Sequence, residues 1–431
     1  MGAELLDIVE ASIMRETETE VLVVGAGPAG LWSALVLAER GIEVSLIDRE
    51  PRTTARSYAC ALHPATLKLL DRFGLAESVI ARGHSVDTLA FYDGATRQGE
   101  IRFSKLGGDF PFLLILPQSA LEGLLEQRLR AAGVPVHWNH RFEDLAQDEE
   151  SVSVVIEELE GTSTGYIVPH WETVVKNRAT LRAQFLIGAD GHNSMVRSRA
   201  GLEYRRVGET ESFAAFEFES DVESANELRV VLDESTSNVL WPLEKNRCRW
   251  TFQLLRAELS GDFPEKERRS VRLAEPAIDE RIRQYVQKVA HQRAPWFASQ
   301  IKQVHWCSEV SFERRLVSEF GRNRCWLAGD AAHQTGPVGI QSMNMGFCEA
   351  ESLGLILHKI LREGAETDLL GKHDRDHQKE WRTLLSLAGG LKTTGQASPW
   401  IAQRASRILP CLPAYGSDLE KLASQIGLAP P

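Results

Sequence analysis

The chain has 431 residues, a formal net charge of −11, 25% charged residues and 43% hydrophobic residues. A chain of this length buries a large core, and we expect it to hold two to three domains. The acidic balance, with no stripe of Lys and Arg, argues against a nucleic-acid partner, because phosphate contacts need clustered positive charge. No apolar stretch reaches the roughly 18 residues that a membrane span needs, so we expect a globular protein with no membrane span.

The amino-terminal residues 1–20 mix leucines with acids and lack both a basic n-region and a continuous apolar h-region. We therefore expect no signal peptide. The six cysteines are scattered and form no C-x-x-C pair, which argues against a disulfide framework and against a metal site. Buried thiols in a cytoplasmic protein are the simplest interpretation.

The first chemical motif is a glycine-rich loop that follows an apolar run over residues 21–24, typical of a central parallel strand. Its pattern is Gly-x-Gly-x-x-Gly, at Gly25, Gly27 and Gly30. These glycines permit a tight turn, the approach of a pyrophosphate and close packing of the next helix. Pro28 suits the first position of that helix, whose amino end attracts phosphates.

A second strand over residues 43–48 completes the unit and ends in an acid, Asp48. A carboxylate at this point accepts a hydrogen bond from an adenosine ribose. A glycine loop alone is a weak signal, but here strand, loop, helix, strand and acid agree. The unit predicts dinucleotide binding without separating NAD from FAD.

Two more strands end in short acidic motifs. Residues 183–189 lead into Asp190-Gly191, and the buried-type run 324–328 leads into Gly329-Asp330. An ordinary Asp-Gly turn is the alternative for the first of these, because that dipeptide is common in loops. A helix is predicted to start near Met343-Asn344.

Taken in this order, the three motifs resemble those of the flavoprotein aromatic hydroxylases, the group A FAD monooxygenases of the p-hydroxybenzoate hydroxylase type. The resemblance covers roughly residues 20–360. It implies an α/β fold with a discontinuous Rossmann-like FAD-binding domain, a mixed β-sheet substrate domain and a C-terminal helical segment. The FAD-binding domain is expected to comprise residues 1–81, 117–203 and 316–360. The substrate domain is expected to comprise residues 82–116 and 204–315, and the C-terminal helical region residues 361–431.

The resemblance also assigns roles to the motifs. The first loop binds the ADP part of FAD, the Asp190 segment contacts FAD and NAD(P)H, and Asp330 binds the ribityl chain. Arg197 belongs to the second segment, and the loop over residues 337–344 wraps the flavin ring. The expected FAD-binding residues are Gly25, Gly27, Pro28, Ala29, Gly30, Asp48, Arg49, Arg56, Gln118, Asp190, Gly191, Arg197, Gly329, Asp330, Gly339, Ser342, Met343 and Asn344.

Two departures from the family pattern stand out. The ring loop carries Ile340 and Ser342 where the family often has glycines. In the segment before residue 63, the family's usual Arg falls on Tyr58, so Arg56 is taken as its substitute.

Candidate catalytic residues are few. The resemblance places Pro337 at the border of the substrate. His63 lies in a suitable loop, but a lone histidine is more often a structural hydrogen-bonding group than a catalytic one. His333 belongs to the third motif and is expected to be structural. The helix near residue 344 should direct its amino end at the flavin ring and stabilise negative charge there.

The substrate region reads as β-strands over residues 212–218, 238–243 and 249–253, with a hairpin turn at 244–247. Four aromatic residues there form a candidate substrate pocket: Phe216, Trp241, Trp250 and Phe252. The alternative, that they form the core of a sheet, is the commoner situation for any one of them.

The resemblance implies an oxidoreductase, an NAD(P)H-dependent FAD monooxygenase that hydroxylates a phenolic or polyketide-like substrate through a flavin C4a-hydroperoxide. NADPH or NADH, O2 and the aromatic substrate are the expected small-molecule partners, and the protein is expected to be a monomer or homodimer. No second glycine loop of comparable quality appears, which fits a transient nicotinamide. The alternative is an FAD-dependent reductase or dehydrogenase acting on a lipid-like substrate, and a non-catalytic binder is disfavoured by the intact FAD motifs.

Overall fold

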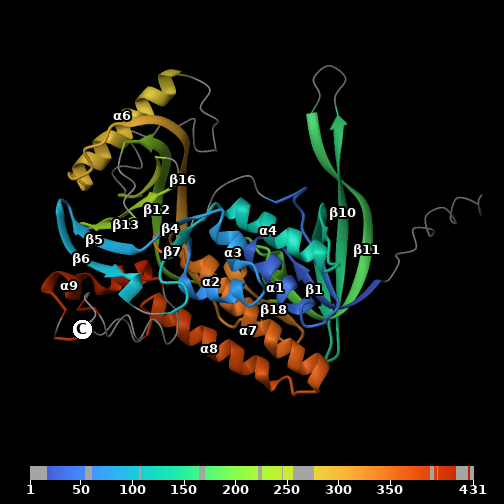
Figure 1. Ribbon diagram of the computed structural model, residues 1–431. Helices are drawn as coiled ribbons and strands as arrows, with labels where there is room; N and C mark the ends of the chain where they lie inside the picture. The colour runs from blue at the N-terminus through green and yellow to red at the C-terminus, as the bar shows by residue number, and fades with distance from the viewer. Residues whose placement is uncertain are drawn as a thin grey trace, which may run out of the picture.

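The computed structural model describes residues 17–53, 61–105, 108–164, 170–221, 226–244, 246–255, 276–388, 393–395, 397–413 and 426–427. It is an α/β protein built around two eight-stranded sheets, which confirms the predicted fold class (Figure 1). The boundaries expected for the domains stay a prediction. None of the described helices is long and apolar enough to cross a membrane.

The first sheet has the order β17-β18-β11-β1-β2-β8, with β10 added beside β11 and β9 beside β10. Its four central strands are parallel, as the apolar run over residues 21–24 predicts for a buried strand. The hairpin of β10 and β11 projects from the body of the molecule (Figure 1). The strands are β1 (Thr17–Val24), β2 (Val44–Ile47), β8 (Val136–His137), β9 (His140–Gln147), β10 (Val152–Thr164), β11 (His170–Gly188), β17 (Gly321–Arg322) and β18 (Cys325–Leu327).

Helix α1 (Pro28–Ala38) begins at the proline that the sequence predicts and is buried along most of its length. It packs against α4 (Gln118–Ala131) and α7 (Gln341–Glu363). The approach to α7 is close, because a Cβ atom placed on Gly354 would lie 2.3 Å from Val36 Cγ1. The Trp32 indole N–H also donates to the Phe347 carbonyl at 3.1 Å. Helix α7 therefore lies firmly against the dinucleotide unit, although the two are far apart in sequence.

Smaller elements complete this half of the molecule. Strands β3 (Ala61–Leu62), β4 (His84–Val86) and β7 (Leu113–Ile115) form a three-stranded sheet. The remaining helices here are α2 (Pro64–Asp71), α3 (Ala76–Ile80), α5 (Met195–Arg199) and α8 (Asp368–Leu384), and α8 runs beside α7 (Figure 1).

The second sheet has the order β19-β16-β12-β15-β14-β13-β5-β6 and is antiparallel except for the pair β13–β5. Helix α6 (Pro276–Arg293) covers its outer face (Figure 1). The strands are β5 (Thr88–Asp93), β6 (Thr96–Arg102), β12 (Tyr204–Ser220), β13 (Glu227–Leu232), β14 (Ser237–Pro242), β15 (Arg247–Leu254), β16 (Ile301–Val317) and β19 (His333–Gln334). The predicted hairpin is confirmed by the antiparallel pairing of Trp241 with Arg249.

Three short turns and one helix occur at the ends of these elements. Helix α9 (Pro399–Ile408) continues into the 3₁₀ turn η4 (Leu409–Cys411), and both lie near the second sheet (Figure 1). The other 3₁₀ turns are η1 (Phe103–Lys105) and η3 (Gly329–Ala331).

Candidate functional site

The three motifs meet at one place between the sheets. A Cβ atom on Gly25, where φ is +105°, would lie 2.3 Å from the Ala189 carbonyl oxygen. A Cβ atom on Gly329, where φ is +66°, would lie 2.8 Å from Ala29 Cβ. Glycine is therefore required at both positions, by backbone conformation and by close approach. The chain brings segments some 300 residues apart into direct contact, as expected for a composite nucleotide site.

The first loop is open on the side where a phosphate would approach. A Cβ atom on Gly27 would meet nothing within 4 Å, and no side chain caps the amino end of α1. The Asp48 carboxylate accepts hydrogen bonds from the Ala26 N–H at 2.6 Å and the Glu50 N–H at 2.8 Å. Burial raises the pKa of Asp48, and these two bonds oppose the rise. Arg49 lies at the surface, 3.5 Å from Glu50.

In the second motif, the Asp190 side chain makes its hydrogen bonds to other groups of the protein. The Asp190 carboxylate accepts from the Ser194 hydroxyl at 2.5 Å and from the Met195 and Val196 N–H groups at 2.7 and 3.1 Å. Asp190 therefore holds the first turn of α5, and Gly191 supplies a positive φ of 80° beside it. Burial raises the pKa of the Asp190 carboxyl.

Arg197, which the sequence assigns to the cofactor, connects the second motif to the third. Its guanidinium donates to the Ala331 carbonyl at 2.8 Å and to the His192 carbonyl at 3.0 Å. It also lies 3.8 Å from the centre of the Tyr204 ring, within cation–π distance. The contacts that the structure gives Arg197 thus fix two loops relative to each other.

Asp330 behaves differently from Asp190. Its side chain is exposed to solvent, yet desolvation by the surrounding protein raises its pKa against the effects of His333, His192 and the nearby Ser342 hydroxyl. The Ser342 hydroxyl oxygen is buried and makes no hydrogen bond of good geometry within the described part of the chain. It nevertheless lies close enough to Asp330 to lower the pKa of that carboxyl, so the two groups are neighbours.

The Asn344 side chain makes four hydrogen bonds to other groups of the protein. Its Oδ1 accepts from the His63 N–H and the Thr66 hydroxyl, both at 2.8 Å. Its Nδ2 donates to the Ala61 carbonyl at 3.1 Å and the Ile340 carbonyl at 2.8 Å. This side chain ties the start of α7 to β3 and α2, so any contact of Asn344 with a cofactor must come from its backbone.

His63 is buried, and its Nε2 lies 2.9 Å from the Gly339 carbonyl oxygen. Desolvation lowers its pKa to about 4, so the imidazole is neutral at pH 7 and donates to that carbonyl. These contacts favour the structural interpretation of His63, which holds the ring loop in place, over the catalytic one.

Helix α7 begins at Gln341, earlier than predicted, because Ile340 adopts a left-handed conformation with φ 51° and ψ 42°. This conformation is unfavourable for a β-branched residue and is natural for the glycine that the family often has there. The C-terminal segment packs on this loop: a Cβ atom on Gly339 would lie 1.8 Å from the Pro410 carbonyl oxygen, and Gln341 Nε2 donates to the Pro410 and Leu412 carbonyls. Nothing in the sequence pattern indicates this contact.

Three of the four predicted pocket aromatics lie on the face of the second sheet that α6 covers. Phe216, Trp250 and Phe252 are fully buried in one core cluster with residues of α6, whereas Trp241 belongs to the other cluster. The placement favours the alternative that these three rings form the sheet core. Side chains alternate along a strand, so the neighbours of Phe216 point the other way.

The opposite face of the same strands is less filled and lies next to Pro337. Phe213 is 3.4 Å from a Cβ atom placed on Gly336, the residue before Pro337. Ala215 follows on this face, paired with Ser308 of β16, and both are only partly buried. We name Phe213, Ala215 and Ser308, with the Trp306 that lies beside them on β16, the inner face.

The remaining predicted residues have ordinary placements. Gln118 is the first residue of α4, and its amide donates to Glu122 at 2.7 Å. Met343 is partly buried and packs against the core. Pro28, Ala29 and Gly30 form the start of α1, and Gly30 is held by contact with the Gly25 carbonyl. Arg56 and Tyr58 lie outside the described residues.

Known proteins are similar to this chain in sequence and fold. A family model described as an FAD binding domain matches residues 18–385. The chain is 30% identical over 379 residues to para-nitrophenol 4-monooxygenase of Pseudomonas sp. (strain WBC-3), with 84% of each chain covered. It is 29% identical to 6-methylpretetramide 4-monooxygenase of Streptomyces rimosus, of which it spans 60% while 85% of this chain is covered.

The fold also matches solved structures. The crystal structure of p-nitrophenol 4-monooxygenase from Pseudomonas putida DLL-E4 superposes with a TM-score of 0.72 at 24% identity, covering 96% of this chain and 97% of that one. The family match over most of the chain, with a 30% identical relative of the same length class, confirms the resemblance drawn from the three motifs. The chain therefore belongs to the FAD-binding family of flavoprotein aromatic monooxygenases.

Proposed function

We propose that this protein is an NAD(P)H-dependent monooxygenase that hydroxylates a phenolic or polyketide-like substrate bound on the inner face. The convergence of the three motifs beside Pro337 and this face carries the proposal, because a flavin held by the motifs would then lie next to an aromatic ring bound on this face. The relatives of this chain include para-nitrophenol, pentachlorophenol and 6-methylpretetramide 4-monooxygenases, which supports an aromatic substrate.

The residues present fit FAD. The open space at Gly27 and the uncapped amino end of α1 would hold the pyrophosphate, and Asp48 would accept from the ribose. The exposed Asp330 residue would bind the ribityl hydroxyls through its carboxylate, and the neighbouring Ser342 hydroxyl would lie toward the ring. When bound, FAD supplies the redox chemistry: it takes electrons from NAD(P)H and delivers one oxygen atom of O2 to the substrate.

The protein contributes electrostatic stabilisation through α7. This helix has 23 residues, and no side chain caps its amino end, which lies in the ring loop. Its first N–H groups and its macrodipole would therefore present a partial positive charge to a flavin ring held by this loop and would stabilise negative charge on it. Ile340 and the Asn344 hydrogen bonds fix the direction of this helix end.

The inner face suits an aromatic ring with a polar group. Phe213 and Trp306 offer apolar and aromatic surface, and Ala215 leaves room between them. Deeper along the strand, the Arg249 guanidinium donates to the buried Glu217 carboxylate at 2.9 Å and lies 5.5 Å from the Trp306 ring. At the other end of this face, Glu211 accepts from Arg314 at 3.1 Å and lies 3.5 Å from a Cβ atom placed on Gly336. The inner face thus has an apolar middle between two ion pairs, which suits an aromatic substrate with a polar substituent.

The test is a panel of phenols, p-nitrophenol included, and polycyclic phenolic polyketides, each supplied to the FAD-loaded enzyme with NADH or NADPH. A substrate should stimulate nicotinamide oxidation, consume O2 and give a product one oxygen atom heavier by mass spectrometry. Catalase and a peroxide assay separate hydroxylation from wasted reduction of O2. A product of changed hydrogen content with no added oxygen would instead establish the reductase or dehydrogenase alternative.

A further inference from the structure

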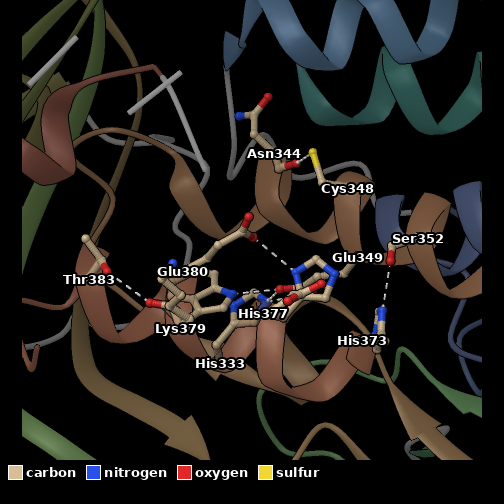
Figure 2. A network of polar contacts seen from close by, with 12 residues as sticks. His333, Asn344, Cys348, Glu349, Ser352, His373, His377, Lys379, Glu380 and Thr383 are labelled. Carbon is tan, nitrogen blue, oxygen red and sulfur yellow. Dashed lines mark hydrogen bonds and ion pairs between the residues drawn. The ribbon is translucent and has the colours of Figure 1, made fainter. Parts of the chain in front are cut away.

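A buried carboxylate that the proposed chemistry does not use lies directly beneath the third motif. Glu349 of α7 is completely inaccessible, as is His333. Figure 2 shows both side chains within one network of polar contacts. Its carboxylate accepts from the Gly329 N–H at 3.0 Å, from His333 Nε2 at 2.9 Å and from the Trp381 indole N–H at 2.7 Å. These three donors satisfy the buried carboxylate. Losing any one of the hydrogen bonds would cost free energy, because the groups are shielded from water.

The carboxylate is held in its charged form. Burial would raise the pKa of Glu349, but the charge and hydrogen bond of His333, with smaller effects of His377 and Trp381, lower it to about 2. Glu349 is therefore ionised at neutral pH. Removing a partner from such a pair leaves an uncompensated buried charge, which is strongly unfavourable.

Glu349 forms hydrogen bonds at both ends of the turn η3. Gly329 is the first residue of η3 and His333 lies just beyond its last residue, so a single carboxylate spans the turn that contains Asp330. From the other side, Arg197 holds the Ala331 carbonyl at 2.8 Å. The Asp330 carboxylate is exposed between these two fixed points.

Helix α8 supplies the outer wall of this arrangement. The Trp381 ring stacks on the His333 ring with centroids 3.8 Å apart and an angle of 22° between the planes. Trp381 is fully buried, and its indole N–H completes the shell around Glu349. A helix that follows the three motifs in sequence thus takes part in shaping the third one.

We propose that Glu349, together with His333 and Trp381, is a positioning group that sets the geometry of Asp330 for FAD and, through the negative charge of Glu349, the reduction potential of the bound flavin. His333 and Trp381 donate hydrogen bonds that fix where this charge lies. A positive charge favours the electron-rich reduced form, and a negative charge disfavours it.

The test compares Glu349→Gln and Trp381→Phe, with FAD affinity of the apoprotein measured by flavin fluorescence and the potential measured against a reference dye. Glu349→Gln keeps the size of the side chain but cannot accept all three bonds, so FAD affinity should fall about tenfold or more, as for loss of a hydrogen bond to a charged group. Its potential should become more positive, because a negative charge is removed, whereas Trp381→Phe removes one donor and no charge and should leave the potential unchanged. A merely structural role would not separate the two variants in this way.

Glu157→Gln is the matched control, since Glu157 of β10 is also a buried carboxylate, paired with Arg141 of β9 and Arg178 of β11 away from the motifs. It should leave FAD affinity and potential unchanged. Unchanged affinity and potential in folded Glu349→Gln would overturn the proposal. Should Glu349→Gln fail to fold, Trp381→Phe decides, because it keeps the stacked ring and removes one N–H: a wild-type affinity would overturn the proposal, and an affinity about threefold or more weaker would support it.

Discussion

Replacing Asn344 by alanine tests whether this side chain holds the protein or the flavin. The substitution leaves the His63 N–H and the Thr66 hydroxyl without their acceptor, and the Ala61 and Ile340 carbonyls without a donor. All four bonds are buried. A typical hydrogen bond contributes about 1 kcal/mol and an orphaned buried group costs about 1–3 kcal/mol, so after partial relaxation we expect a loss of about 3–5 kcal/mol.

The assay is urea unfolding of the apoprotein, followed by tryptophan fluorescence, beside FAD titration of the same preparation. Asn177→Ala is the matched control, because Asn177 is exposed and its Oδ1 accepts only from the adjacent Arg178 N–H. It should change the midpoint little. If Asn344→Ala apoprotein unfolds at the wild-type urea concentration while its FAD affinity falls, the side chain binds the flavin and the structural assignment is refuted.

The other predictions use the same two readouts with steady-state kinetics. Asp330→Ala should weaken FAD binding about tenfold with little loss of apoprotein stability. Asp190→Ala should lower stability by about 1–2 kcal/mol, as for loss of a helix cap. The reverse pattern would contradict the cofactor role of Asp330 and the structural role of Asp190. Ala215→Phe should raise the substrate KM by about tenfold or more, because the larger side chain fills the inner face. Phe216→Leu should lower stability by about 1 kcal/mol and leave KM unchanged. Equal effects on KM would refute the assignment of Ala215 to the substrate side and Phe216 to the α6 side. Because desolvation lowers the pKa of His63 from 6.5 to about 4, the folded state disfavours its protonation, so its contribution to stability is complete above pH 6.5 and is lost as the pH falls toward 4. Melting temperatures of His63→Asn should vary less than those of the wild type over this range, and an equal slope would count against the assignment.

The dinucleotide unit could be predicted from sequence because its determinants are local. Pro28 begins α1 as expected, and the glycines at positions 25 and 30 are where backbone contact requires them. The recognition of FAD followed from three such local units in a fixed order, and the family match confirms it.

The roles of individual side chains were harder to predict because they depend on partners distant in sequence. Asp190 and Asp330 follow similar strands, yet the first caps α5 and the second opens to solvent. The aromatic strand residues show the same limit: composition identified the strands, but only the strand register shows that Phe216 faces α6 and Ala215 does not. Pattern reasoning assigns a residue to a strand more readily than to one face of it.

The contact between the ring loop and the C-terminal segment has a consequence for synthesis of the protein in the cell. Gln341 depends on the carbonyls of Pro410 and Leu412, and Gly339 packs on Pro410. A nascent chain can complete its glycine-rich first motif early, but the loop that surrounds the flavin ring has all its supports only after residue 412 has left the ribosome. Full capture of the cofactor is thus a late step, and ribosomes stalled short of that point carry chains with an unfinished ring site.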